Sequence, residues 1–324
     1  MVTSKVRYLR ALMKAYYSYK TKKTNLCYLP IRLWIEPTNI CNLKCVMCLN
    51  KSLKEKGYMD FEVYKKIIDE AKDFVFDVNL FHRGESMLHP RIYDMISYAH
   101  KNGIYTRLFT NATQLNEKNA MRIINSGLDF ISFSFDGYTK EDYEKIRVGS
   151  DFDKTIANIT NFLKLKETKR NKPYVMFESI EFSNGGKDLK QKRVGFKNRL
   201  KNLPLNKLAV RSPHNWGGDY NIEIDKSPKN FLPCTFLWYA LTILYDGTVL
   251  PCPQDFFGKL ELGNINDGSI KQIWNNDKVV PLRKAMVTKN YQKLVPCYNC
   301  DRIFRKNFFG IPVKYLRALF YGKF

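Results

Sequence analysis

The chain has 324 residues, a formal net charge of +23 at pH 7, and a hydrophobic content of 44% with 14% aromatic residues. This length can bury one large domain or two modest ones, and the composition excludes a disordered chain. No apolar run reaches the roughly 18–20 residues that span a bilayer, and the first residues lack the apolar core and cleavage site of a signal peptide. We therefore expect a cytoplasmic protein, in which the eight cysteines are more often metal ligands than disulfides.

The positive charge is concentrated at the two ends of the chain. Residues 1–26 carry seven Lys or Arg and no acidic residue, and residues 301–324 carry six bases against one acid. Four apolar residues recur at helical spacing among the N-terminal bases: Val6, Leu9, Met13 and Tyr16. Such a helix can lie at the inner face of an anionic membrane as a peripheral contact, but we favour the alternative that its apolar stripe packs onto the domain. The run VKYLRAL near the C-terminus resembles the N-terminal VRYLRAL and is interpreted in the same way.

Three closely spaced cysteines give the first chemical signal. After a β-branched and aromatic run at 31–35, Cys41, Cys45 and Cys48 form a C-x3-C-x2-C pattern. Iron–sulfur clusters are held by cysteine thiolates, and a cubane cluster normally takes four. Three thiolates would leave one iron free to bind a substrate or a cofactor. A zinc knuckle is the alternative that this spacing also allows.

From residue 32 to about residue 212, short strand-like runs alternate with helical patterns, which predicts βα units around a parallel sheet. The expected strands are 32–36, 78–82, 105–110, 130–135, 174–180 and 207–212. The expected helices are 61–71, 91–101, 117–126, 140–146, 153–165 and 189–200. Gly103 and Gly127 follow two of these helices, where a helix commonly ends.

Polar residues gather where the second, third and fourth expected strands end. They are Arg83, Gly84, Glu85, Asn111, Ser134 and Asp136. In an α/β barrel the C-terminal ends of the strands carry the chemistry, and the three-cysteine loop follows the first strand. Turn chemistry alone also favours Asn and Asp-Gly at such positions.

The pattern changes after the last expected strand. Residues 214–230 are rich in turn formers and are interpreted as a linker. Cys234 and Cys252 then flank an expected hairpin with its turn at Asp246-Gly247, and VPCYNC supplies a C-x2-C pair. Cys27 precedes the first strand, so we expect a structural thiol at the opposite face of the barrel.

Together these motifs resemble the radical S-adenosylmethionine (radical SAM) enzymes with a C-terminal SPASM/Twitch extension, over residues 28–302. The resemblance implies an α/β fold, a partial (β/α)6 TIM-like barrel at 28–215 followed by a small hairpin-and-helix iron–sulfur domain at 216–303. Basic segments at 1–27 and 304–324 flank these domains.

The resemblance also implies the cofactors. A 4Fe-4S cluster on Cys41, Cys45 and Cys48 would bind S-adenosylmethionine through its open iron. The expected contacts of this cofactor are Met47, Gly84, Glu85, Asn111, Ser134 and Asp136. Glu85 stands in a segment similar to the family's GGEP, but Arg83 replaces the first glycine and could aim a guanidinium at the pocket. A second 4Fe-4S cluster would have its full set of ligands in Cys234, Cys252, Cys297 and Cys300, with a structural zinc as the alternative.

A fully ligated second cluster is suited to moving electrons. We therefore expect oxidation of a carbinol carbon in a sugar-like or aminocyclitol-like substrate, as in the family's aminocyclitol dehydrogenases. The candidate acid or base residues are Glu178, Arg211 and His214. The high positive charge indicates an anionic substrate, small or carrier-linked, and a reductase or flavodoxin-type protein would donate the electron.

Other functions remain open from the sequence. Radical epimerisation generally needs a hydrogen donor on the opposite face of the substrate, and Cys27 is poorly placed for that role. Peptide or RNA modification is another alternative, although only 40 residues precede Cys41, fewer than a peptide-recognition domain commonly takes. The non-enzymatic alternative is a metal-stabilised basic nucleic-acid-binding protein, but the aromatic residues follow core periodicity more than a stacking platform.

Overall fold

The computed structural model describes residues 2–168, 172–182, 186–305, 307–308 and 311–312. Its strands are β1 (Arg32–Ile35), β2 (Asp77–Leu80), β3 (Tyr105–Thr110), β4 (Phe130–Ser134), β5 (Tyr174–Ile180), β6 (Lys207–Arg211), β7 (Ala240–Ile243), β8 (Thr248–Leu250), β9 (Gly263–Asn264), β10 (Asn307–Phe308) and β11 (Ile311–Pro312). The first nine form one sheet in the order β6-β5-β4-β3-β2-β1-β7-β8-β9. Neighbouring strands from β6 to β7 run parallel, which confirms the expected α/β architecture.

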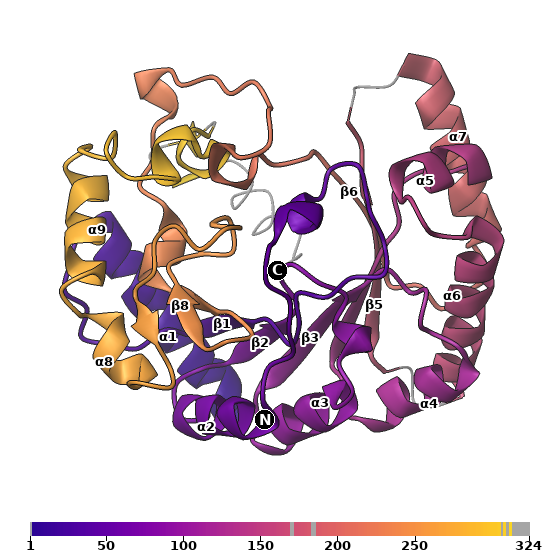
Figure 1. Ribbon diagram of the computed structural model, residues 1–324, viewed down its shortest axis with the longest axis horizontal. Helices are drawn as coiled ribbons and strands as arrows, with labels where there is room; N and C mark the ends of the chain where they lie inside the picture. Colours follow the sequence, from indigo (N-terminus) through magenta and orange to yellow (C-terminus); the bar gives the residue numbers. More distant parts are fainter. Residues whose placement is uncertain (1, 169–171, 183–185, 306, 309–310, 313–324) are drawn as a thin grey trace.

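The helices cover the outside of this curved sheet (Figure 1). They are α1 (Val2–Lys20), α2 (Phe61–Ala71), α3 (Ile92–Lys101), α4 (Glu117–Asn125), α5 (Lys140–Ile146), α6 (Phe152–Glu167), α7 (Gly186–Arg199), α8 (Ile270–Trp274) and α9 (Val279–Val287). Local chemistry fixes several starts: the side chains of Asp60, Asn116 and Asp151 accept hydrogen bonds from first-turn amides. The expected helix stops at Gly103 and Gly127 are confirmed, with φ of 77° and 82°.

Successive side chains of each strand point to opposite faces of the sheet, and this alternation separates two apolar layers. Leu33, Val78 and Phe133 belong to the large core cluster that the helices cover. On the other face, Phe130, Met176 and Ala209 form a small cluster inside the barrel, with Phe109 packed against it. Residues of β5 and β6 that share the face of Met176 and Ala209 therefore point into the barrel.

The C-terminal hairpin extends the barrel sheet. β7 pairs with β1 in parallel, from Arg32 opposite Ala240 to Ile35 opposite Ile243. The expected turn at Asp246-Gly247 is confirmed, since β7 and β8 are antiparallel and Gly247 has a φ of 86°. The sheet is therefore continuous on both sides of the expected boundary at residue 216.

The stretch expected to be a linker is packed at its start. Asn215 is buried, donates to the carbonyl oxygen of Asn299 at 2.6 Å, and accepts from the amide of Asp301 at 3.1 Å. A side chain at Gly217 would meet Pro296 at 2.6 Å. This segment therefore supports the turn that carries the C-x2-C pair, an order that turn-forming composition alone does not reveal.

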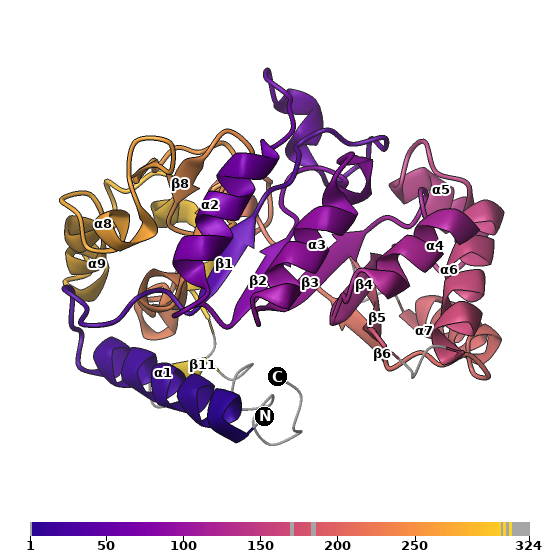
Figure 2. The same ribbon diagram turned by 90° about the horizontal axis from the view of Figure 1, so that it is seen from below.

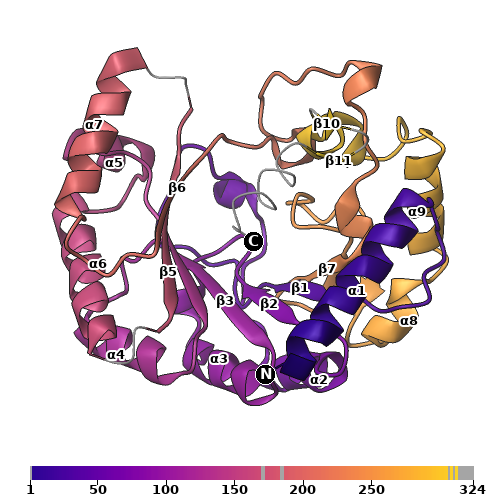
Figure 3. The same ribbon diagram turned by 180° about the vertical axis from the view of Figure 1, so that it is seen from behind.

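Helix α1 lies along the molecule beside β1, α2 and the C-terminal helices (Figures 2 and 3). It is anchored at both ends: the Tyr8 ring is 5.2 Å from that of Phe76, just before β2, and the Tyr19 hydroxyl donates to the carbonyl oxygen of Pro233 at 3.2 Å. These tyrosines turn the expected stripe outward, so Leu9, Met13 and Tyr16 are 58%, 70% and 52% exposed. The expectation that this stripe packs onto the domain is wrong.

The similar run near the C-terminus lies outside the described residues. None of the described helices combines the length and the apolar character needed to cross a bilayer.

Candidate active site

The loop after β1 carries the first three cysteines, all partly buried. Burial raises the pKa of the Cys41 thiol to about 12, and the neighbouring Cys45 and Cys48 add to the rise. All three thiols belong to the loop segment 41–48, which follows the end of β1. Buried thiols of this kind are deprotonated when a metal centre replaces their protons, so the set fits a cluster with three protein ligands.

Of the other four cysteines, Cys234 and Cys300 are buried, and Cys252 and Cys297 are partly buried. Burial raises the pKa of the Cys252 thiol well above its usual range, and the charges of the other three cysteines raise it further. These three are Cys234, Cys297 and Cys300. Four thiolates would make a full ligand set for one cluster. As the side chains stand, no three His, Cys, Asp or Glu residues within the described ranges come close enough together to hold a metal ion, so cluster binding by both sets of cysteines stays a prediction.

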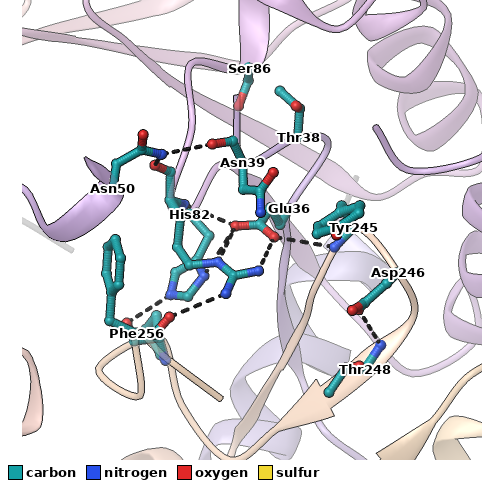
Figure 4. A network of polar contacts seen from close by, with 12 residues as sticks. Glu36, Thr38, Asn39, Asn50, His82, Ser86, Tyr245, Asp246, Thr248 and Phe256 are labelled. Carbon is teal, nitrogen blue, oxygen red and sulfur yellow. Dashed lines mark hydrogen bonds and ion pairs between the residues drawn. The ribbon is translucent and has the colours of Figure 1, made fainter. Parts of the chain in front are cut away.

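A buried polar network lies where β1 and β2 end (Figure 4). Arg83 donates to both carboxylate oxygens of Glu36, from Nε at 2.8 Å and Nη2 at 2.7 Å, and its Nη1 donates to the carbonyl oxygen of Phe256 at 3.3 Å. Burial would raise the pKa of Glu36, but the hydrogen bonds from Arg83 and the nearby His82, whose Nδ1 atom lies 3.6 Å from the carboxylate, hold it at about 2. The guanidinium is thus committed to this network, and the expectation that it aims at the pocket is wrong.

The same network connects the two groups of cysteines. Glu36 opens the loop that leads to Cys41, while the Nε2 atom of His82 lies 2.9 Å from the carbonyl oxygen of Pro253, next to Cys252. The expected second strand stops two residues early, at Leu80, and Arg83 then turns its backbone amide to Glu36 at 3.1 Å. Sequence reasoning missed the roles of Glu36 and His82. The only sequence feature that pointed to this network was the charged Glu36 at the end of a buried strand.

Close backbone packing holds the first cysteine loop against the end of β2. A Cβ atom at Gly84 would lie 2.4 Å from the carbonyl oxygen of Thr38 and 2.6 Å from that of Ile40. The amide of Glu85 donates to the same Ile40 oxygen at 2.9 Å. Asn50 closes the loop, because its Nδ2 atom donates to the carbonyl oxygens of Asn39 and Arg83, each at 2.7 Å.

Glu85 and Asn111 fix the end of β3 beside this loop. The buried Glu85 carboxylate accepts from the amide of Met87 at 3.0 Å, the hydroxyl of Thr110 at 2.8 Å and the amide of Asn111 at 2.7 Å. The Asn111 side chain donates in turn to Asn42 at 3.0 Å. Their contact with S-adenosylmethionine, and that of the half-buried Met47, stays a prediction.

Asp136 is buried and holds an arginine against the cysteine loop. Its Oδ2 atom accepts from Nη2 of Arg147 at 2.6 Å, and Oδ1 accepts from the amide of Ile180 at 2.6 Å. Nη1 of Arg147 lies 3.9 Å from the sulfur of Cys45. Sequence reasoning missed Arg147, because nothing in its local pattern distinguishes it from a surface arginine after a short helix.

Two of the three candidate acid or base residues meet inside the barrel. Ser134 pairs in register with Glu178, and the Glu178 carboxylate accepts from Nε of Arg211 at 3.1 Å. Glu178 and Arg211 are both partly exposed on the inner face. His214 is not part of this pair; its ring packs 4.2 Å from Trp216. Cys27 is exposed and precedes β1, at the opposite end of the strand from Cys41.

Exchanging Arg147 for Met together with Asp136 for Asn is expected to make the reduction potential of the first cluster more negative. A positive charge beside a thiolate ligand stabilises the reduced state, and the lost positive charge acts on Cys45 more strongly than the lost carboxylate does. An electron paramagnetic resonance titration measures the potential. Arg193→Met, which breaks an ion pair with Glu181 away from the cysteines, is the control. An unchanged potential in the double variant would contradict this role of Arg147.

Comparison with known families agrees with this geometry. Residues 35–173 match the radical SAM superfamily, and residues 234–301 match the SPASM iron–sulfur cluster-binding domain. The chain therefore contains a radical SAM domain followed by a SPASM domain. The expected S-adenosylmethionine and iron–sulfur cofactors are confirmed at this level, and iron–sulfur binding is favoured over the zinc alternatives. A single cluster in the SPASM domain stays a prediction.

Several characterised proteins are similar over most of the chain. A tungsten-containing aldehyde ferredoxin oxidoreductase cofactor-modifying protein of Pyrococcus furiosus is 24% identical over 83% of this chain and 86% of its own. A PqqA peptide cyclase of Gluconobacter oxydans is 25% identical over 84% and 83%. The S-adenosyl-L-methionine-dependent 2-deoxy-scyllo-inosamine dehydrogenase of Niallia circulans is 23% identical over 83% and 92%.

The fold is also shared with a solved structure. The crystal structure of BtrN in complex with AdoMet and 2-DOIA superposes with a TM-score of 0.58 at 21% identity, covering 85% of this chain and 94% of that one. At this identity the likeness establishes the partial barrel with its small C-terminal domain.

Proposed function

We propose that this radical SAM enzyme oxidises a carbinol carbon of a small sugar-like or aminocyclitol-like substrate to a ketone. The observation that carries the proposal is the set of four buried or partly buried cysteines within the part of the chain that matches the SPASM domain. Four thiolates leave no vacant iron for a substrate, so this second site is suited to accepting an electron. When bound, the first cluster and S-adenosylmethionine supply the 5′-deoxyadenosyl radical that removes a hydrogen atom from carbon.

The oxidation needs a proton acceptor and a group that holds the substrate, and residues of this chain can supply both. Converting a secondary alcohol to a ketone removes one hydrogen atom from carbon, one electron, and one proton from oxygen. Glu178 is the candidate proton acceptor, because its carboxylate is partly exposed on the inner face of the barrel. Arg211, 3.1 Å from that carboxylate, is placed to hold the substrate oxygen or an anionic substituent. His214 is the candidate contact further along the chain toward the SPASM domain.

The similarity to a 2-deoxy-scyllo-inosamine dehydrogenase, over 92% of its length, supports this substrate class. The similarity to a PqqA peptide cyclase, over 83% of its length, favours peptide modification as the second candidate. The two candidates differ in product, since only the first forms a carbonyl group on a small molecule.

Anaerobic turnover with dithionite, in place of the expected reductase or flavodoxin-type donor, tests the proposal. A panel of aminocyclitols, sugar alcohols and their phosphates is incubated with S-adenosylmethionine, and mass spectrometry measures 5′-deoxyadenosine and the carbonyl product. We expect equal amounts of both for at least one substrate, with deuterium moving from the carbinol carbon into 5′-deoxyadenosine.

Variants at two carboxylates separate chemistry from structure. Glu178→Gln should lower the carbonyl yield by about 100-fold, the usual effect of losing a general base, while 5′-deoxyadenosine still forms. Glu181→Gln is the control, because this carboxylate pairs instead with Tyr138 and Arg193. Formation of 5′-deoxyadenosine without any carbonyl across the panel would contradict the proposal, as would an unchanged yield in Glu178→Gln.

A further inference from the structure

Helix α1 divides into a packed face and a free face. The packed face consists of Tyr8, Ala15, Ser18 and Tyr19, of which Ala15 and Ser18 are buried. The Tyr19 ring meets that of Trp238 edge-on at 5.4 Å, and Trp238 donates from Nε1 to the carbonyl oxygen of Lys23 at 2.9 Å. These contacts attach the helix to the rest of the fold, so the opposite face is not needed to hold it in place.

The free face nevertheless carries a continuous apolar stripe. Its members are Val6, Leu9, Met13, Tyr16 and Tyr17, all exposed. Their spacing of three and four residues aligns them along one side of the helix. A contiguous exposed apolar patch on a folded protein usually marks a surface that contacts something else.

Positive charge borders this stripe. Arg7, Arg10 and Lys14 are exposed, and at 3.6 residues per turn they fall together along one edge of the apolar stripe. Residues 1–26 hold seven bases and no acid, so nothing within this segment neutralises them. A free face that is half apolar and half basic has the composition of a helix that lies in an anionic lipid interface.

We propose that α1 docks the protein onto an anionic lipid surface. Leu9, Met13 and Tyr16 would enter the boundary between headgroups and acyl chains, and Arg10 and Lys14 would meet the lipid phosphates. A nucleic acid would pair with the bases but leave the apolar stripe in water. A second copy of the chain would cover the apolar stripe but would bring two positively charged segments together. Neither a nucleic acid nor a second copy therefore accounts for both the apolar stripe and the basic edge.

The fold gives this docking a direction. The packed face of α1 meets Phe76, just before β2, and Trp238, just before β7, so the helix lies at the N-terminal ends of these strands. The loop with Cys41, Cys45 and Cys48 follows the opposite end of β1. Docking through α1 therefore leaves the first cysteine loop on the aqueous side, where a substrate can reach it.

Co-sedimentation of the full-length holoenzyme with lipid vesicles tests the inference. We expect binding to vesicles of phosphatidylcholine mixed with phosphatidylglycerol, weak binding to phosphatidylcholine alone, and loss of binding at high salt. Combining Leu9→Ser, Met13→Ser and Tyr16→Ser should weaken binding about tenfold or more, since each apolar side chain adds to interfacial affinity. All three side chains are exposed, so circular dichroism and iron content should stay unchanged.

The control exchanges two exposed apolar residues elsewhere, Phe182→Ser and Val194→Ser, and should bind as the wild type does. Wild-type protein that stays in the supernatant with anionic vesicles would overturn the inference. Equal pelleting of the stripe variant would do so too. Analytical ultracentrifugation tests the alternative that a second copy of the chain covers the stripe. A wild-type protein that is dimeric and does not bind vesicles, with a stripe variant that is monomeric, would assign the face to a second copy instead.

Discussion

Replacing Arg83 by methionine is expected to lower the free energy of unfolding by about 3–5 kcal/mol, because it leaves a buried carboxylate without its partner. Glu36 is fully buried and takes two hydrogen bonds from this guanidinium. The same change removes the donor to the carbonyl oxygen of Phe256, which follows Cys252 in the SPASM domain. We therefore expect the loss of stability to be accompanied by loss of iron from the second cluster.

Thermal unfolding of the anaerobic holoenzyme, with iron content measured alongside, checks this expectation. The double variant Glu36→Gln, Arg83→Met should recover part of the loss, since a neutral amide is cheaper to bury than an unpaired charge. Arg91→Met is the control, because its ion pair with Asp94 is exposed and contributes little. An Arg83 variant as stable as the Arg91 variant would show that the pair does not stabilise the fold.

The pair also predicts an acid dependence. The pKa of Glu36 falls from its ordinary 4.5 to about 2 on folding. A carboxylate with a depressed folded pKa contributes stability above its unfolded pKa, and this contribution is lost as the pH falls from 4.5 toward 2. The double variant lacks the group, so its stability should fall less steeply over this range than that of the wild type. Both proteins share the acid lability of their clusters, so the difference between them isolates Glu36.

The elements of the barrel were predictable because local sequence determines them. β-branched and aromatic runs define the strands, capping residues such as Asp60 start the helices, and glycines such as Gly103 end them. The cysteines could be proposed as cluster ligands from their spacing, because clusters are commonly held by short sequence patterns, and this assignment stays a prediction. The hairpin was predictable from Asp246-Gly247, because its turn needs a residue with a positive φ and glycine adopts one readily.

The polar network could not be predicted because its members are remote in sequence. Arg83 is 47 residues from Glu36, and Arg147 is 102 residues from Cys45. In the family's pattern Arg83 stands where a glycine is usual. In the structure its guanidinium joins the loops after β1 and β8. Distances of this kind depend on strand order and register, which a single sequence does not reveal.

Helix α1 shows a different limit. Its sequence has two apolar stripes, and amphipathicity alone does not say which one packs. The choice depends on Phe76 and Trp238, which supply ring partners for Tyr8 and Tyr19. The stripe with the more regular spacing is therefore the exposed one.

Gly84→Ala is expected to lower the rate of 5′-deoxyadenosine formation by about 100-fold or more, the cost of displacing catalytic groups by about 1 Å. The added Cβ would lie 2.4 Å from the carbonyl oxygen of Thr38 and 2.6 Å from that of Ile40, and neither backbone atom can rotate away as a side chain could. The loop before Cys41 or the turn with Glu85 must shift instead. The four cysteines of the SPASM domain lie outside this contact, so their iron should be retained.

Gly195→Ala provides the matched control. This glycine lies in α7, and an added Cβ would meet nothing within 4 Å. Alanine should leave turnover unchanged and stabilise the helix by about 0.5–1 kcal/mol. Turnover with a saturating small-molecule reductant and iron content per chain separate the two variants. Normal turnover in Gly84→Ala would mean that the first cysteine loop tolerates displacement, and that its position is set by the cluster rather than by the backbone packed against it.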